Sequence, residues 1–255
     1  MSRFKLLTVG NPKIEKSVAF GYLTAVLHLA PAKLSGFEVC AGRTEGCTRA
    51  CLNTAGRGGI ARGGMLTYDT IANGERTNAI QAARVRKTRL YFEDRATFMA
   101  LLVKEIRRFE LLARSLGLKP AIRLNGTSDI PWERVKTPMG NANVMTSFPQ
   151  VQFYDYTKRA NRTNLPRNYH LTFSLADGND AAAVQALANG MNVAAVFHKV
   201  PGQFVFPYSA DYLSLAPVPV INGDEHDLRF LDPRGVIAGL KAKGNAKRDV
   251  SGFVR

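Results

Sequence analysis

The sequence predicts an α/β protein built as an incomplete or irregular β/α barrel. An early apolar run, one long amphipathic helix and six later apolar runs that each end in polar residues support this fold class. Such near-continuous apolar runs are typical of parallel strands whose two faces are both covered. The linkers between the runs are uneven, and only about a dozen residues separate Tyr156 from Tyr169. An irregular barrel is therefore expected, with a doubly wound open sheet as the alternative.

Length and composition favour a single domain over residues 1–255. The chain is 45% hydrophobic, which is enough to bury a substantial core. Within this domain, residues 1–17 are expected to be a basic, loosely packed lead-in. Residues 40–64 form a loop rich in cysteine and glycine, and residues 118–245 carry the strand series.

The early elements follow from local patterns. The run from Val18 to Leu29 is rich in β-branched and aromatic residues and predicts a buried strand. Residues 75–89 have a mainly helical composition with several basic side chains. A second helix is expected from Asp94 to Leu116, because apolar residues recur there at intervals of three and four and place one apolar stripe on the core.

The N-terminal sequence contains no apolar stretch of secretory length, and no run approaches the ~20 apolar residues needed to span a bilayer. We therefore expect a soluble protein of the cytoplasm with no membrane partner. Three cysteines, an odd number, favour free thiols or metal ligands over a disulfide framework in that reducing compartment.

The net charge predicts a polyanionic partner. The chain carries 35 basic and 20 acidic residues, for a formal net charge of +15, and the excess is spread along the sequence. Neutralisation of phosphates makes DNA or RNA the expected partner. The alternative is a generally basic soluble protein.

The three cysteines occupy one short segment with the spacing Cys-x6-Cys-x3-Cys. If the chain is helical from Cys47 onward, Cys47 and Cys51 lie on one face of that helix, and the loop at Gly42 and Gly46 brings Cys40 beside them. Such a cup can bind a metal ion or an iron–sulfur cluster.

The spacing favours a 4Fe-4S cluster over zinc, and zinc over no metal. Structural zinc usually takes two ligands from a tight Cys-x2-Cys knuckle, and neither a knuckle nor a fourth cysteine is present. A cluster held by three cysteines leaves one iron open to a histidine, solvent, a cofactor or substrate. The glycines after Cys51 would allow an anionic group to approach the backbone.

The ends of the predicted strands supply candidate catalytic residues, because parallel strands direct their carboxyl ends to one edge. These candidates are Asn125, Asp129, Asp155, Lys158, Glu225, His226 and Asp227. The dense acidic stretch from Asp224 to Asp227 can bind a divalent metal ion, supply an acid and a base, or form a salt-bridge network with Arg229 or Arg248.

Phosphate contacts are expected from basic side chains in the glycine-rich loop and the first helix. The candidates are Arg57, Arg62, Arg84 and Lys87. For the helical residues the alternative is a solvated basic face.

Several sequence blocks resemble one known family. They include GYLTAVLHLAP, ACLNTAGRGG, RKTRLYFEDRATFMA, KPAIRLNGTSDIPWE and NGDEHDLRFLDP. They are similar to blocks of the phage proteins called gene product eighty-eight, over nearly the whole chain. This resemblance implies a phage protein that works in the bacterial cytoplasm.

The arrangement also resembles that of the radical S-adenosylmethionine enzymes, which pair an incomplete α/β barrel with a three-cysteine loop near the first strand. That resemblance implies S-adenosylmethionine as a possible cofactor. The spacing departs from the Cys-x3-Cys-x2-Cys of those enzymes.

These observations lead to three functional hypotheses. The first is an iron–sulfur protein that cleaves phosphodiester bonds of nucleic acid, with a divalent metal ion as a further cofactor. The second is a radical enzyme that uses S-adenosylmethionine to modify a base, nucleotide or peptide. The third is a DNA-binding protein without catalytic activity whose cluster is structural.

Overall fold

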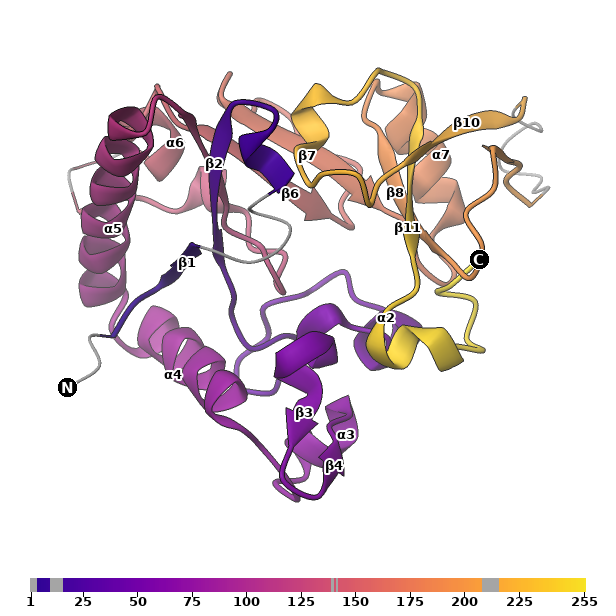
Figure 1. The fold of residues 1–255 in the computed structure, drawn as a ribbon, viewed down its shortest axis with the longest axis horizontal. Helices are drawn as coiled ribbons and strands as arrows, with labels where there is room; N and C mark the ends of the chain where they lie inside the picture. The colour runs from indigo at the N-terminus through magenta and orange to yellow at the C-terminus, as the bar shows by residue number, and fades with distance from the viewer. Residues whose placement is uncertain (1–3, 10–15, 139, 141, 208–215) are drawn as a thin grey trace. The chain divides into compact units, whose positions relative to one another are not determined.

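The structure is a computed structural model that describes residues 4–9, 16–138, 140, 142–207 and 216–255. It is a mixed α/β fold with one large, mostly parallel sheet (Figure 1). The α/β class predicted from the sequence is confirmed.

The elements are as follows. The strands are β1 (Leu7–Val9), β2 (Tyr22–Leu27), β3 (Ile60–Ala61), β4 (Gly64–Met65), β5 (Lys119–Arg123), β6 (Gln152–Thr157), β7 (Tyr169–Ser174), β8 (Val193–Phe197), β9 (Gln203–Phe204), β10 (Val218–Asn222) and β11 (Ile237–Lys241). The α-helices are α2 (Glu45–Arg49), α3 (Tyr68–Ala72), α4 (Ala79–Glu93), α5 (Arg95–Ser115), α6 (Val144–Ser147) and α7 (Asp180–Ala188). Five 3₁₀ turns are η1 (Leu52–Thr54), η2 (Gly56–Gly59), η3 (Trp132–Arg134), η4 (Arg229–Leu231) and η5 (Gly244–Arg248).

Among the described residues, the large sheet has nine strands in the order β1-β2-β5-β6-β7-β8-β11-β10-β9. β1 runs antiparallel to β2, and β9 runs antiparallel to β10. The pairs β2–β5, β5–β6, β7–β8, β8–β11 and β11–β10 are parallel. Because β1 and β9 lie at opposite ends of this order, the described strands do not close into a barrel. The incomplete or irregular barrel expected from the sequence stays a prediction.

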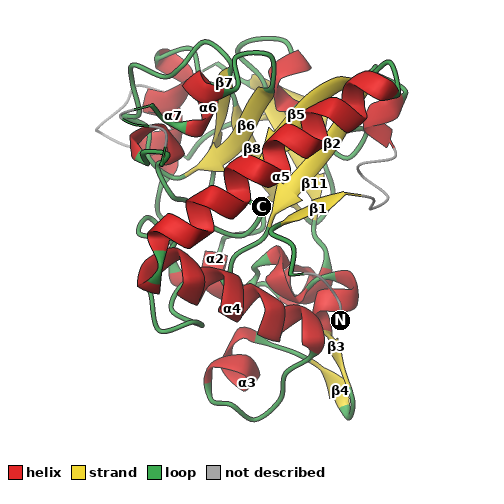
Figure 2. Cartoon of the chain, turned by 90° about the vertical axis from the view of Figure 1, so that its left-hand side faces the viewer, coloured by secondary structure: helices red, strands yellow, loops and turns green. Residues whose placement is uncertain are grey.

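All six apolar runs after the long helix form strands, namely β5, β6, β7, β8, β10 and β11. The long helix is also confirmed as α5, which Figure 2 shows as a continuous red helix. Asp94 caps its start by accepting the Thr97 amide at 3.0 Å. The chain leaves it through Gly117, whose φ of +68° suits glycine.

The chain divides into two compact units, each described by itself below. Unit 1 contains residues 1–40, 81–155 and 164–170, and unit 2 contains residues 41–80, 156–163 and 171–255. The single domain expected from length and composition stays a prediction.

Unit 1 packs around the apolar stripe of α5. Phe98, Leu102 and Ile106 are completely buried, and the Phe98 ring stacks at 6.3 Å on that of Trp132. The described part of the lead-in is ordered, because Leu6 and Leu7 are buried and donate their amides to the Glu105 carboxylate at 2.8 to 3.1 Å. The loose packing expected for residues 1–17 is therefore wrong for Leu6 and Leu7, whereas the other residues of the range 4–9 are exposed. Residues 1–3 and 10–15 lie outside the described residues.

Unit 2 packs helix α7 and strands β7, β8 and β11 around one apolar core. Its central side chains include Phe173, Val193 and Ile237, all completely buried. The last residues pair with β8, since the Arg255 amide donates to the Val196 carbonyl at 2.8 Å. Unit 2 also contains the two-stranded sheet of β3 and β4.

Candidate functional site

The carboxyl ends of the parallel strands in unit 2 collect polar side chains at one edge. β7, β8, β11 and β10 are parallel neighbours, so the segments that leave them meet at the same edge of the sheet. These segments supply Asp177, His198, Lys243 and Asp224, respectively. We call this region the carboxyl edge of unit 2.

Lys158, a predicted catalytic residue that follows β6, is held by contacts within unit 2. Its ammonium donates to Ser174 Oγ at 2.8 Å and lies 5.8 Å from the centre of the Phe253 ring. The backbone of Gly42 passes close by, because a Cβ on Gly42 would lie 3.0 Å from Lys158 Cβ. The glycine-rich approach to the cysteine helix therefore runs alongside Lys158.

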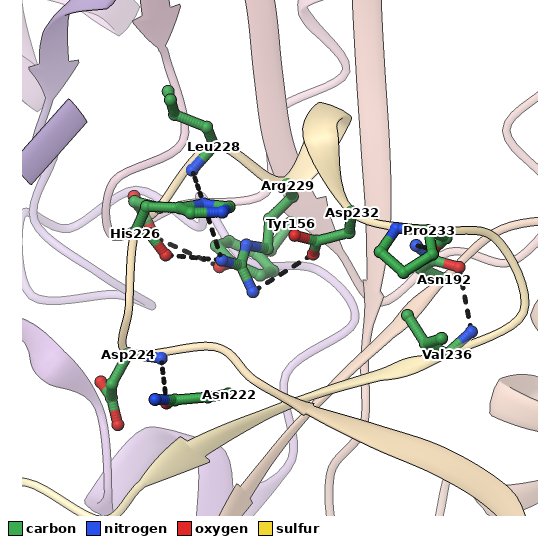
Figure 3. Close-up of polar contacts among 11 residues, drawn as sticks. Tyr156, Asn192, Asn222, Asp224, His226, Leu228, Arg229, Asp232, Pro233 and Val236 are labelled. Carbon is green, nitrogen blue, oxygen red and sulfur yellow. Dashed lines mark hydrogen bonds and ion pairs between the residues drawn. The ribbon is translucent and has the colours of Figure 1, made fainter. Parts of the chain in front are cut away.

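The acidic stretch after β10 is folded onto neighbouring cations and amides. Asp224 forms an ion pair with Lys243 and accepts the Lys241 amide at 2.9 Å. The Asp224 amide donates to Asn222 Oδ1 at 3.1 Å (Figure 3). Glu225 is exposed. The Asp224 carboxylate thus joins the ends of β10 and β11.

A second group of charges in this loop surrounds the buried side chain of Arg229, which is 1% exposed. Its Nη1 lies 3.2 Å from Asp232 Oδ2, and its Nη2 donates to the His226 carbonyl at 2.5 Å (Figure 3). The His226 Nδ1 accepts the Leu228 amide at 3.2 Å, so the proton of a neutral ring lies on Nε2. Arg229 thus forms its ion pair with Asp232, which lies outside the acidic stretch from Asp224 to Asp227, and Asp224 pairs with Lys243. The salt-bridge network of that stretch with Arg229 or Arg248 stays a prediction.

Asp232 is the titratable group that sequence reasoning missed here. Burial raises the pKa of its carboxyl from 3.8 to about 6, Arg229 opposes that rise, and Asp227 adds to it. Asp227 is itself buried and accepts from the Tyr156 hydroxyl at 3.3 Å. The chain after Asp232 is anchored by Asn192, whose side chain donates to the Pro233 carbonyl at 2.7 Å.

The other predicted catalytic residues lie in unit 1, where Asn125 and Asp155 share a buried hydrogen-bond network. The Asp155 carboxylate accepts the Asn125 amide at 2.6 Å and the Tyr169 hydroxyl at 2.8 Å. The Asn125 side-chain oxygen accepts from Trp132 Nε1 at 3.0 Å. Asp129 is buried, and its amide donates to the Val39 carbonyl at 2.8 Å. These contacts hold the carboxyl ends of β5 and β6 together.

The three thiols are partly exposed, and none forms a disulfide. Cys40 donates through Sγ to the Thr127 carbonyl at 3.7 Å in unit 1. In unit 2, Cys47 lies in α2, which ends at Arg49, and Cys51 begins the next turn by accepting the Asn53 amide at 3.5 Å. The expectation that Cys47 and Cys51 share one helical face is therefore wrong.

The donor chemistry of three thiols fits an iron–sulfur cluster. Within the described ranges, however, no three Cys, His, Asp or Glu side chains are gathered as a metal site. The cluster and the divalent ion stay predictions.

The cysteine helix α2 is fixed to the carboxyl edge of unit 2. The Asp177 carboxylate accepts the Thr44 hydroxyl and the Gly46 amide, the latter at 3.2 Å. Cys47 packs against a small core that contains Ala176 and Phe253. Sequence reasoning did not select Asp177, although it ends the apolar run YHLTFSLAD that predicted β7.

Basic side chains gather on unit 2 from two segments far apart in sequence. Residues 54–66 and 241–248 contain no acidic residue. Asn245 joins them by donating to Thr54 Oγ1 at 3.0 Å and to the Leu66 carbonyl at 3.1 Å. The exposed cations of the two segments include Arg57, Arg62, Lys247 and Arg248, which we call the basic surface. Arg57 and Arg62 were predicted as phosphate contacts from the sequence, whereas Lys247 and Arg248 were not selected.

The other two predicted phosphate contacts lie in α4 of unit 1. Arg84 is partly exposed, but Lys87 is buried and its ammonium donates to the Leu6 carbonyl at 2.7 Å. Burial lowers the pKa of Lys87 from 10.5 to about 8, partly opposed by Glu105. The prediction that Lys87 contacts phosphate is corrected, because its ammonium is buried in unit 1 and donates to a backbone carbonyl there.

Among the described residues, no helix combines the length and apolar character needed to cross a bilayer. The curated proteins and the solved structures compared with the chain provide no match. A family model described as Gene product 88 matches residues 5–255. The chain therefore belongs to the Gene product 88 family, the phage protein family that its sequence blocks resemble.

Proposed function

We propose that this protein binds nucleic acid through the basic surface of unit 2. One observation carries the proposal: Asn245 holds residues 241–248 against residues 54–66, and both segments are basic and free of acidic residues. Two separate basic stretches thereby become one cationic surface. Nucleic acid is the partner whose repeating charge matches such a surface.

The electrostatics of this surface favour a phosphate backbone. The surface carries four exposed cations, Arg57, Arg62, Lys247 and Arg248. Each can contact a phosphate without a rearrangement of the core. Each phosphate neutralised on duplex DNA releases bound counterions and makes the salt dependence of affinity steeper by about 0.9 in a log–log plot. Four contacts correspond to a contribution of roughly 3.6 to that slope.

Binding is better supported than phosphodiester cleavage. Asp224 is paired with Lys243, Asp227 accepts from Tyr156, and Asp155 accepts from Asn125 and Tyr169. These carboxylates serve contacts within the protein. The hydrolytic hypothesis therefore rests on the residue types at the strand ends, whereas binding rests on a surface that can be tested directly.

A second candidate is an iron–sulfur function of the cysteine segment. The observation that favours it is the attachment of α2, with Cys47, to the carboxyl edge of unit 2 through Asp177, because ligands of open α/β sheets bind at this edge. Cys40, Cys47 and Cys51 would supply the thiolates. A bound iron–sulfur cluster would supply an iron open to substrate or to S-adenosylmethionine.

Two measurements on protein purified without oxygen test the second candidate. Iron and sulfide near four per chain, lost in Cys47→Ser, support the cluster. Colourless wild-type protein with zinc or no metal contradicts it. Formation of 5′-deoxyadenosine from S-adenosylmethionine under strong reductant separates radical chemistry from hydrolysis.

The binding proposal is tested by fluorescence anisotropy with labelled single-stranded and duplex DNA and RNA. A variant with Arg57, Arg62, Lys247 and Arg248 changed to alanine is expected to bind roughly tenfold or more weakly than wild type. The matched control changes Lys104, Arg107, Arg108 and Arg114, exposed cations of α5, to alanine and loses the same charge. Equal losses in both variants would contradict a localised surface, and wild-type protein that binds none of the probes would contradict the proposal itself.

A further inference from the structure

The hairpin of β3 and β4 is a small projection of unit 2 with an arginine at its turn. Ile60 pairs with Met65 and Ala61 pairs with Gly64, so Arg62 and Gly63 form a two-residue connection. Gly63 has a φ of +89°, a conformation that glycine accommodates best. Figures 1 and 2 show β3 and β4 side by side.

One face of this hairpin is apolar and open to solvent. Ile60 and Met65 are cross-strand partners, so their side chains lie on the same face. They are 59% and 53% exposed. The next residue, Leu66, is completely buried, as expected for a side chain that alternates to the opposite face. The exposed pair is therefore not part of the anchor that holds the hairpin to unit 2.

Hydrogen bonds brace the hairpin on both strands. Arg76 Nη1 donates to the Gly63 carbonyl at 2.6 Å, and Asn78 Nδ2 donates to the Ile60 carbonyl at 2.8 Å. The Leu66 amide donates to the Gly59 carbonyl at 2.8 Å and extends the pairing. Three hydrogen bonds therefore fix the backbone of the hairpin that carries the apolar pair.

The segment that carries the apolar pair is positively charged. Arg57 precedes β3, Arg62 is in the turn, and Arg76 contacts the turn. Residues 46–68 contain no acidic side chain. An exposed apolar pair between arginines is complementary to a surface that is apolar at its centre and anionic at its margins. A partly unstacked DNA base step, with apolar base faces between two phosphate backbones, has this arrangement.

We infer that the β3–β4 hairpin enters the minor groove of duplex DNA, with Arg62 in the groove and Ile60 and Met65 wedged against a base step. Apolar side chains such as isoleucine and methionine partly unstack bases when they are inserted from the minor groove. Narrow A·T-rich minor grooves attract arginine through their enhanced negative potential. The wide, shallow minor groove of A-form RNA offers neither feature. This inference rests on the proposed nucleic-acid binding and specifies the mode of that binding.

The test uses the full chain and an A·T-rich DNA duplex that contains 2-aminopurine at one base step. Binding is followed by anisotropy, and unstacking is followed by the rise in 2-aminopurine fluorescence. Wild-type protein is expected to raise this fluorescence at least twofold. A minor-groove drug such as netropsin is expected to displace the protein from the duplex. The Ile60→Ser/Met65→Ser variant is expected to abolish the fluorescence rise and to retain the salt dependence that reports phosphate contacts.

Matched variants separate the insertion of Ile60 and Met65 from the loss of any two exposed apolar side chains. Leu111→Ser/Leu116→Ser removes two similarly exposed side chains, one in α5 and one at its C-cap, and is expected to leave the fluorescence rise unchanged. Arg62→Ala is expected to weaken binding to A·T-rich DNA more than to G·C-rich DNA. Unchanged melting temperatures show that each variant folds.

The outcomes distinguish the inference from the proposal on which it rests. If wild-type protein binds duplex DNA but raises no 2-aminopurine fluorescence, or if the serine variant raises it equally, the minor-groove mode is wrong and the binding proposal survives. Tighter binding to duplex RNA than to DNA also overturns the minor-groove mode. If wild-type protein binds no nucleic acid, both fail.

Discussion

Asn245 donates to Thr54 Oγ1 at 3.0 Å across 191 positions of sequence. The same amide donates to the Leu66 carbonyl at 3.1 Å. These two bonds join the segment that follows β11 to the segment that leads into and out of the β3–β4 hairpin. The basic surface exists because of this junction, since neither segment alone brings together its four cations.

Replacing Asn245 with alanine is expected to lower both stability and affinity. Two partly buried hydrogen bonds are lost, and the free energy of unfolding should fall by roughly 1–3 kcal/mol. DNA binding should weaken as well, because residues 241–248 are no longer held. Urea unfolding and anisotropy check the two effects. Asn189→Ala, which removes one exposed bond to Gln185, is the control and should change neither.

Replacing Gly46 with alanine is expected to destabilise unit 2. A Cβ there would lie 2.0 Å from Ser251 Oγ and 2.7 Å from Asp177 Oδ1. Ser251 Oγ donates to Asp249 at 2.7 Å, so relief requires either the loss of this bond or displacement of the cysteine helix. We expect a loss of roughly 1–3 kcal/mol in the free energy of unfolding. Gly202→Ala, with no atom within 4 Å of the new Cβ, should lie near wild type, and equal melting temperatures for both variants would contradict the packing described.

Asp232 should make stability depend on pH in the acid range. Its folded pKa of about 6 is above the ordinary 3.8, so the folded state binds more protons than the unfolded state between these values. The free energy of unfolding contributed by this group therefore falls as pH rises from about 4 to 6. Urea unfolding from pH 4 to pH 7 should show this fall in wild type and a flatter profile in Asp232→Asn. Parallel profiles for the two proteins would show that burial does not raise the pKa of Asp232.

Lys87→Met separates a structural lysine from a phosphate contact. The folded pKa of Lys87 is about 8, below the ordinary 10.5, so wild type should gain stability from this group as pH rises from about 8 to 10.5. The variant should lack that gain. Its affinity for DNA should stay within about twofold of wild type, since the ammonium donates to Leu6 and is not exposed. A loss of affinity as large as that of Arg62→Ala would restore the role predicted from the sequence.

The strands and the long helix could be predicted because their signals are local. Each apolar run after Gly117 formed a strand, and the three- and four-residue spacing in α5 identified its buried face. The choice between an irregular barrel and an open sheet, the two alternatives that the sequence left, could not be made in the same way. Whether a sheet closes depends on pairing between distant strands, and the order of nine strands ends at β1 and β9.

The candidate site was predictable in its residue types and less so in its contacts. Arg57 and Arg62 stood out as arginines among glycines, but Asn245 has partners more than 170 residues away and no local signal. Lys87 carries a weak signal, because it lies four residues before the buried Tyr91 on α4. The end of α2 before Cys51 depends on a five-residue helix whose extent no periodicity could define.

The most direct test of nucleic-acid binding by the basic surface is the slope of log affinity against log salt for duplex DNA. Wild type is expected to show a slope steeper by about 3.6 than the variant without Arg57, Arg62, Lys247 and Arg248. The variant without four α5 cations is expected to keep the wild-type slope. Equal slopes for wild type and the basic-surface variant would contradict the account.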